Sequence, residues 1–173
     1  IQWLEGQHKA EILALGPLTN IAILLLARPD LASKIARLTW MGGGITRGNQ
    51  TASAEFNAYA DPEALAIVLS RNVPLTMVDL DACRRVEITE ADVAPLEKPL
   101  LSDLLGGYLD IALSRGRPAM ALYDPVAAAV LVRPDLFMLA PAEVTMELSG
   151  QHTRGRTIVD RRDPSKANAM IIS

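Results

Sequence analysis

The stretch 38–80 constrains the fold more than any other part of the sequence. It begins with the apolar run 38–41, which three glycines, Gly42–Gly44, bring to an end. A polar segment follows, and Asp61-Pro62-Glu63 then opens a run with helical spacing that leads to a second apolar run at 75–80. A strand, a helix and a second strand in this order predict a βαβ unit, whose strands pair in parallel.

The rest of the sequence continues this alternation. Further strands are expected at 11–15 and 143–148, with weaker candidates at 157–160 and 169–172, and further helices at 21–27, 30–37, 100–114 and 126–132. Half of the residues are hydrophobic and few are aromatic, which suits helices packed on a parallel sheet. We therefore predict an α/β fold with a largely parallel sheet and flanking helices, forming one domain over residues 1–173.

Both ends of the chain are expected to be cut. Ile1 lies in what we interpret as the inside of a helix, and Ile171-Ile172-Ser173 lie in or just after a strand. The domain is therefore expected to be incomplete at each end.

Charge and cysteine content exclude several classes of protein. The net charge of −3 is spread without a basic block, so nucleic acid is not expected as a main partner. No apolar run reaches the roughly 18 residues of a membrane span. The single cysteine, Cys83, excludes an internal disulfide and a CxxC metal site, and it favours a reducing compartment, the cytoplasm.

The polar segment after the glycines carries Asn49, Glu55 and Asn57 within nine positions. Two amides and a carboxylate can donate to and accept from hydroxyl groups, which is typical of a site for a sugar. The alternative is that these side chains only satisfy the backbone of the turns. The glycine triplet matches neither phosphate-binding pattern, GxGxxG or GxxxxGK[ST].

Four polar pieces are expected to meet at one edge of the sheet: Gly16–Asn20, 41–44, 49–57 and Tyr123-Asp124-Pro125. Their carboxylates and amide oxygens suit Ca²⁺ or Mg²⁺, and no His or Cys pairing favours zinc. As alternatives, Asp124 and Thr19 are plain helix N-caps.

These residues, in this order and spacing, resemble the inosine-uridine-preferring nucleoside hydrolases. The matching pieces are Gly16-Pro17-Leu18-Thr19-Asn20-Ile21-Ala22, Met41-Gly42-Gly43-Gly44, Gly48-Asn49, Ala54-Glu55-Phe56-Asn57, Asp61-Pro62-Glu63-Ala64 and Asp124-Pro125. The resemblance spans nearly the whole chain and is weakest over 83–117. It implies an α/β domain that cleaves the N-glycosidic bond of ribonucleosides, yielding base and ribose, with a calcium-bound water as the nucleophile. It also implies a homo-oligomer, a dimer or a tetramer.

The same resemblance assigns roles to single residues. It implies that the Thr19 main-chain carbonyl and the Asp124 carboxylate bind calcium. The substrate-binding residues that it implies are Asn49, Glu55, Phe56, Asn57 and Asp124. Carboxylates beside the ribose would stabilise an oxocarbenium-like transition state.

The chain departs from the family pattern in two respects. The Asp-rich signature that supplies the general base and most calcium ligands is not in these 173 residues, nor is the carboxyl-terminal helix. The chain alone, without the general base, is therefore expected to be inactive. Second, Tyr123 occupies the position of a His that protonates the leaving base. A phenol has a pKa near 10, which makes it a poorer proton donor, but it can stack on a base or hydrogen-bond to it.

Two other functions stay open. One is a catalytically inactive, truncated homologue that binds a ribosyl ligand or acts as an assembly subunit. The other is a nucleotide-binding α/β module that uses the Gly42–Gly44 turn. A phosphate bound at that turn would favour the second of these.

Overall fold

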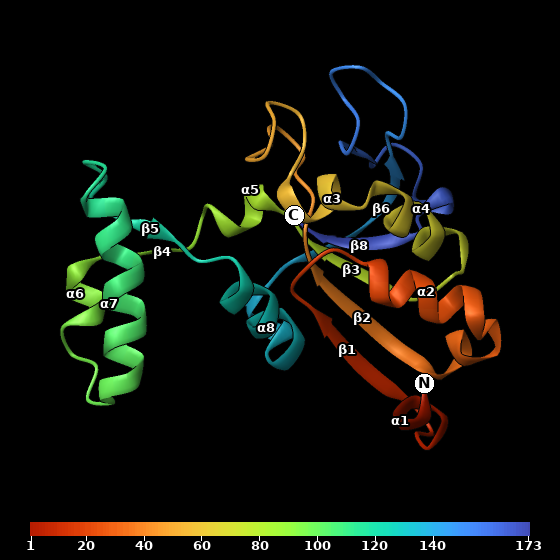
Figure 1. Ribbon diagram of the computed structural model, residues 1–173, viewed down its shortest axis with the longest axis horizontal. Helices are drawn as coiled ribbons and strands as arrows, with labels where there is room; N and C mark the ends of the chain where they lie inside the picture. Colours follow the sequence, from red (N-terminus) through yellow and green to blue (C-terminus); the bar gives the residue numbers. More distant parts are fainter.

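The computed structural model describes residues 1–173, and a sheet of six strands forms its centre (Figure 1). The strands are β1 (Ala10–Ala14), β2 (Ile35–Met41), β3 (Leu75–Val78), β6 (Leu139–Met146), β7 (Thr157–Asp160) and β8 (Ala169–Ile172), in the order β1-β2-β3-β8-β6-β7. The first three strands and β8 pair in parallel, whereas β6 is antiparallel to both β8 and β7. The predicted α/β fold is confirmed, and both weak strand candidates are strands.

Helices cover both faces of the parallel part of the sheet. α2 (Thr19–Ala27) and α4 (Pro62–Ser70) pack on one face, in a buried cluster that includes Trp40. α8 (Asp124–Val132) covers the other face, in a second cluster that includes Met41. Neighbouring side chains of β2 enter different clusters because successive strand residues point to opposite faces. All four residues of β3 are buried, as expected for a central parallel strand.

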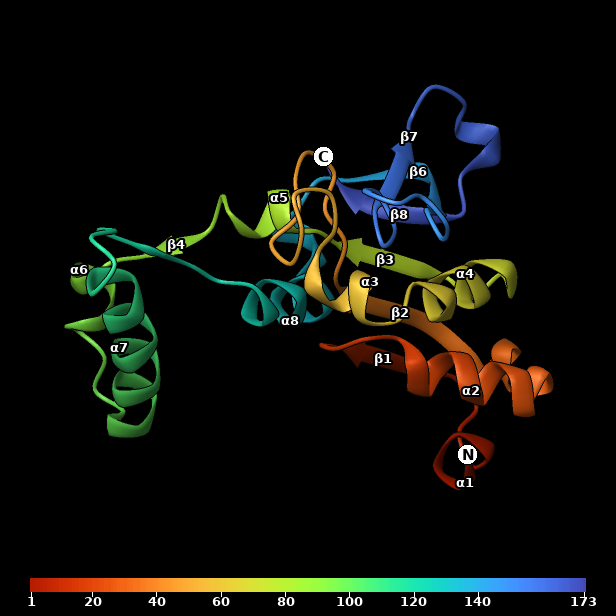
Figure 2. The same cartoon turned by 45° about the horizontal axis from the view of Figure 1, so that its top comes forward.

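A separate group of elements lies to one side of this sheet in both views (Figures 1 and 2). It consists of β4 (Glu87–Ile88), α6 (Glu90–Val93), α7 (Pro99–Leu113) and β5 (Met120–Ala121), with β4 and β5 paired antiparallel. Thr89 and Asp92 form a capping box at the start of α6, in which the Asp92 carboxylate accepts from the Thr89 backbone N–H at 2.8 Å. No helix in the structure is long and apolar enough to cross a membrane.

The remaining elements are short. They are α1 (Gln2–Glu5), α3 (Phe56–Ala60), α5 (Leu80–Cys83) and the 3-10 helices η1 (Pro29–Lys34), η2 (Pro134–Leu136) and η3 (Pro164–Lys166). The polar segment after the glycines contains a helix that was not predicted, α3, which Glu55 caps. The third strand ends at Val78 rather than Leu80, because Asp79 caps α5.

Other element boundaries differ from the prediction in length. β2 begins at Ile35, three residues early, and β6 covers Leu139–Met146 rather than 143–148. The alternative interpretation of Thr19 as a helix N-cap is wrong: Thr19 already lies in α2, and the cap position, Leu18, has no side-chain hydrogen bond. The Thr19 hydroxyl instead donates to the carboxylate of Asp61.

Asp61 is the predicted cap of α4, and it joins two helices. Its Oδ1 accepts from the Ala64 N–H at 3.0 Å, while Oδ2 accepts from the Thr19 hydroxyl. Replacing Asp61 with alanine is expected to lower the free energy of unfolding by about 1–3 kcal/mol, because a cap and a helix–helix hydrogen bond are both lost. Chemical denaturation of the full-length protein measures this. Asp110→Ala, on the exposed side of α7, is the control and should change stability by less than about 0.5 kcal/mol.

Candidate functional site

The predicted site residues lie along the edge where β1, β2 and β3 end. The arrowheads of these strands point the same way, and the segment after β2, helix α3, helix α5 and the start of α8 gather at that end (Figure 2). Strand carboxyl ends in open α/β sheets are the usual place for ligands.

The glycine turn after β2 is held by Glu55. The carboxylate accepts from the Gly43 N–H at 2.8 Å and from the N–H groups of Asn57 and Ala58 at 2.9 and 3.1 Å. The side chain is buried, with 2% exposed, and burial raises its pKa while these N–H groups oppose the rise. Glu55 thus organises the turn and α3, and its contact with a substrate stays a prediction.

The two asparagines present free polar groups next to this turn. Asn49 Oδ1 accepts from the Phe56 N–H at 2.9 Å, which leaves its exposed Nδ2 without a partner in the chain. Asn57 Nδ2 donates to the Met41 carbonyl at 2.9 Å, and no group of the chain donates to its Oδ1. Phe56 lies between them in sequence and is 53% exposed. One free donor and one free acceptor beside an exposed aromatic ring suit a ligand with hydroxyl groups.

Asp124 is not the N-cap that the alternative interpretation required. It is the first residue of α8, the cap position is Tyr123, and no side-chain cap hydrogen bond is made. The carboxylate is exposed and takes part in no hydrogen bond or ion pair, and partial desolvation raises its pKa. A carboxylate that does no structural work at a strand-end edge is available for a ligand.

Thr19 does not cap a helix; it contacts Asp61 through its hydroxyl. Its hydroxyl is engaged by Asp61, and its main-chain carbonyl lies in the first turn of α2. The structure joins Asn49, Glu55 and Asn57 into one hydrogen-bonded group, but no hydrogen bond or ion pair links Thr19 or Asp124 to that group.

Cys83 is a buried cysteine whose pKa depends on the carboxylates of the strand-end edge. Its Sγ lies 3.8 Å from the Tyr123 carbonyl oxygen. Burial, which is the largest cause, and the charges of Asp79, Asp124 and Glu55 together raise the pKa of the thiol to about 12. The three carboxylates therefore lie near enough to this buried, protonated thiol for their charges to act on its pKa.

Cys83 is expected to be unreactive in the folded protein. Because its pKa is about 12, the thiolate that attacks a disulfide reagent is nearly absent at about pH 8. We expect no labelling of Cys83 by a chromogenic disulfide reagent in the native full-length protein and complete labelling in guanidinium. Rapid labelling of native Cys83, located by mass spectrometry, would contradict this placement.

Two further acids were missed from the sequence: Asp79 lies inside the run 75–80 that was taken as a strand, and Asp81 directly follows it. Asp79 Oδ1 accepts from the N–H groups of Asp81 and Ala82, while its Oδ2 is buried without a partner. Asp81 Oδ2 accepts from the N–H groups of Ile45 and Thr46 at 2.7 and 3.0 Å and so anchors the segment after the glycines. The signal available was a pair of acids just after an apolar run.

A metal site is not complete in this chain. No group of three or more His, Cys, Asp or Glu side chains is arranged to hold a metal ion. Asp124 is the one predicted side-chain ligand, and the Thr19 carbonyl is the one predicted main-chain ligand. Since Ca²⁺ takes 6–8 oxygen ligands, these two residues do not form a calcium site by themselves.

A cavity of about 520 Å³ adjoins Asp124. It is lined mostly by apolar side chains from α7 and the start of α8: Leu101, Leu104, Leu105, Tyr108, Leu122, Tyr123, Asp124 and Pro125. Burial raises the pKa of Tyr108, so its hydroxyl keeps its proton. An apolar cavity with two phenol rings and one carboxylate suits a flat heterocycle.

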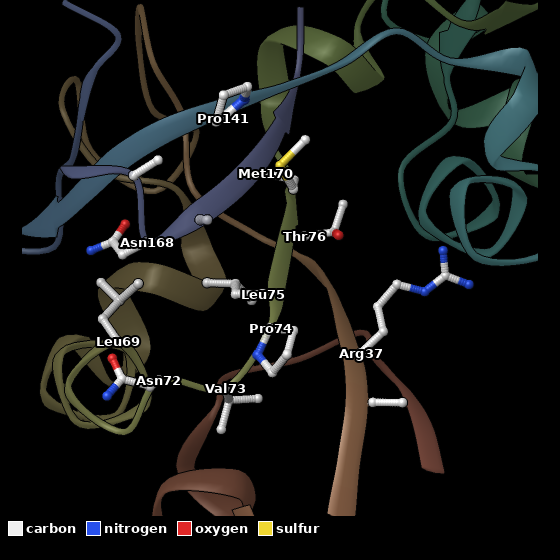
Figure 3. A pocket seen from close by; sticks show the side chains of 13 residues that line it. Arg37, Leu69, Asn72, Val73, Pro74, Leu75, Thr76, Pro141, Asn168 and Met170 are labelled. Atoms are coloured by element: carbon white, nitrogen blue, oxygen red, sulfur yellow. The ribbon is translucent and has the colours of Figure 1, made fainter. Parts of the chain in front are cut away.

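Another cavity, of about 590 Å³, lies at the opposite edge of the sheet (Figure 3). Its walls come from the starts of β2, β3 and β8, and Arg37, Asn72 and Asn168 surround it. Both oxygen and nitrogen of the Asn168 side chain are bound to the Val144 backbone, and Arg37 pairs with Glu11 at 2.9 Å. This cavity is a weaker ligand site than the strand-end edge because it lies where β2, β3 and β8 start, whereas ligands of open α/β sheets bind at the carboxyl ends of the strands.

Comparisons with known proteins identify the same family that the sequence motifs resemble. Residues 1–173 match the model of a family described as inosine-uridine preferring nucleoside hydrolase. The pyrimidine-specific ribonucleoside hydrolase RihA of Shewanella woodyi is 36% identical over 178 residues, covering 97% of this chain and 57% of that protein. RihA of an Enterobacter species is 37% identical over 164 residues, covering 90% and 52%.

Two solved structures share the fold. The purine-preferring ribonucleoside hydrolase from Gardnerella vaginalis has a TM-score of 0.85 at 28% identity, covering 99% of this chain and 58% of that one. An inosine-guanosine nucleoside hydrolase has a TM-score of 0.86 at 26% identity, covering 99% and 60%. The chain thus spans little more than half the length of the curated relatives it matches.

Proposed function

The chain belongs to the inosine-uridine preferring nucleoside hydrolase family, and on this basis we propose that the full-length protein hydrolyses the N-glycosidic bond of ribonucleosides. In this reaction the bond between C1′ and the base nitrogen breaks, water supplies the oxygen on C1′, and the base leaves with the bonding electrons and gains a proton. The products are ribose and a free base, as expected of an enzyme in purine or pyrimidine salvage.

The observation that carries this proposal is the free carboxylate of Asp124 at the strand-end edge. It makes no hydrogen bond in the chain although it begins a helix, where a carboxylate usually caps. A negative charge beside C1′ stabilises the positive charge that develops on the ribose in the transition state. We propose that Asn49, Glu55, Phe56, Asn57 and Asp124 together bind the ribose.

The apolar cavity next to Asp124 supports the proposal because it offers a binding place for the base. Its two phenol rings can stack on a heterocycle, and its volume exceeds what a single base requires. We propose that Tyr123 contacts the leaving base by stacking or by donating a hydrogen bond. The named relatives include pyrimidine-specific and purine-preferring hydrolases, so both base classes belong in the assay.

We include calcium in the proposal for the whole protein, with a calcium-bound water as the nucleophile, because the family resemblance implies it. Within this chain the Asp124 carboxylate and the Thr19 carbonyl are the residues that would contact the ion. They are too few for a calcium site, so we derive no step of the reaction through the ion, and we expect residues 1–173 alone to be inactive.

The partners follow from the same proposal. We propose a nucleoside as the ligand, a homo-oligomer of two or four copies, and a place in the cytoplasm, where the buried free thiol of Cys83 is compatible with a reducing medium. Neither nucleic acid nor a membrane is part of the proposal.

A non-catalytic protein that binds a ribosyl ligand is the second candidate. The observation that favours it is Tyr123, a weak acid at the position where the family has a proton-donating His. A protein that only binds a ribosyl ligand needs no proton donor to the leaving base, whereas catalysis does.

The test is the release of free base by the full-length protein. Inosine and uridine are incubated separately with the protein in the presence of calcium, and hypoxanthine or uracil is quantified by chromatography. We expect at least one of them to be hydrolysed. Failure to hydrolyse any nucleoside, combined with calorimetric binding of ribose, would replace the proposal with the non-catalytic candidate.

A further inference from the structure

We propose that Thr157 of β7 is a positioning residue for the sugar site: its hydroxyl fixes the Gly43–Gly44 peptide and, through it, the carboxylate of Glu55. This inference rests on the proposed function, because it concerns the same ribose-binding segment. It gives a role to a strand 113 positions away from the glycine turn, which no local pattern connects to it.

The Thr157 hydroxyl makes two hydrogen bonds to a single residue. Its Oγ1 accepts from the Gly44 N–H at 2.9 Å and donates to the Gly44 carbonyl at 2.8 Å. The side chain is 2% exposed, so water does not substitute for either bond. The hydroxyl therefore supplies hydrogen bonds that a neighbouring strand would otherwise give, because Gly44 lies outside the sheet.

The peptide between Gly43 and Gly44 is thereby fixed at both ends. Its N–H is held by Thr157, and its carbonyl, that of Gly43, accepts from the Leu80 N–H at 3.0 Å. Gly43 has a φ of +80°, a conformation that side chains rarely adopt. A glycine there is free to rotate unless its neighbours hold it, and Thr157 is one of the groups that does so.

The fixed turn then orients Glu55. The Gly43 N–H donates to Glu55 Oε2 at 2.8 Å, and the same carboxylate caps α3 through the N–H groups of Asn57 and Ala58. Asn57 is held by this helix and by the carbonyl of Met41, and its free Oδ1 is one of the groups proposed to bind ribose. Loss of the Thr157 hydroxyl would loosen this chain of contacts without removing any group that touches the sugar.

The test compares Thr157→Val, which keeps the shape and loses the hydroxyl, with Thr157→Ser, which keeps the hydroxyl. In the full-length protein with uridine and inosine, we expect T157V to raise KM about tenfold and to change kcat by less than about threefold, because binding groups are misplaced. T157S should restore KM to within about threefold of the wild type. If T157V does not fold, Thr157→Ala takes its place with the same expectations.

Thr145→Val is the matched control, because Thr145 lies exposed on the neighbouring strand of the same hairpin, one position along the ladder. It should leave KM and kcat unchanged. Wild-type KM in T157V, or equal damage by T157S and T157V, would overturn the proposal.

Hydrogen exchange measured by mass spectrometry separates this inference from the proposed function. We expect faster exchange over residues 42–46 in T157V and wild-type exchange in T157S, whether or not any nucleoside is hydrolysed. A wild-type protein that turns over no nucleoside would refute the proposed function alone. Unchanged exchange over this segment in T157V would refute the role of Thr157.

Discussion

Replacing Asp124 with asparagine is expected to lower kcat/KM of the full-length protein for its best nucleoside at least about a hundredfold. Asparagine has nearly the same shape, so the change removes a negative charge and little else. The charge matters because the ribose becomes positive as the glycosidic bond breaks. Since Asp124 makes no cap hydrogen bond, the midpoint of thermal unfolding should stay close to that of the wild type.

Asp135→Asn is the matched control for this prediction. Asp135 lies exposed just beyond the other end of α8 and pairs with Arg133 at 2.8 Å, away from the strand-end edge. Its kcat/KM should remain within about twofold of the wild type, as surface pairs contribute little. A D124N protein with wild-type kinetics would remove Asp124 from the site, because loss of folding would not explain the result.

Replacing Gly43 with alanine is expected to lower the free energy of unfolding by about 2–5 kcal/mol. An added Cβ would lie 2.9 Å from Thr157 Cγ2, a distance that real Cβ atoms essentially never show, and 3.1 Å from Met77 Sδ, which is tighter than most Cβ contacts. The φ of +80° adds a further cost for any residue with a side chain. Urea denaturation of the full-length protein measures the loss, and uridine and inosine kinetics should show a raised KM in whatever fraction stays folded.

Gly107→Ala is the contrasting control for the glycine prediction. Gly107 lies inside α7, and an added Cβ would meet nothing within 4 Å. Alanine favours the helix over glycine, so this variant should be more stable by about 0.5–1 kcal/mol. Equal effects of the two substitutions would show that the turn at Gly43 is not tightly held.

Local patterns predicted the framework well because their causes are local. The glycines that end β2 and the Asp61-Pro62 start of α4 are set by backbone conformation and capping, and both were recognised from neighbouring residues. The apolar runs that became β7 and β8 were also identified, although burial patterns over four residues are weak signals. Asn49 and Asn57 were recognised as candidate binding residues because their side chains carry amide groups.

Other features depend on contacts between distant segments and had no signal in the sequence. The capping of α3 by Glu55 was missed because the segment has no helical periodicity over only five residues. The hydrogen bonds between Thr157 and Gly44 form only because the fold places β7 beside the glycine turn. The side position of α6 and α7 likewise follows from packing that the amino-acid pattern of 83–117 does not specify.

The layout separates two tasks within the strand-end edge. Glu55, Asp81 and Thr157 hold the backbone of the segment 42–57. Asn49, Asn57 and Asp124 present groups that the chain itself does not use. A hydrogen-bonded frame beside free polar groups would keep the geometry of the proposed binding site before a ligand arrives.

The most direct measurement is a crystal structure of the full-length protein with ribose bound. The account predicts that sugar hydroxyls lie within hydrogen-bonding distance of Asn49 Nδ2, Asn57 Oδ1 and the Asp124 carboxylate, at the ends of β2 and β3. Ribose bound instead in the cavity around Arg37, Asn72 and Asn168, or at no fixed place, would contradict the assignment of the sugar site.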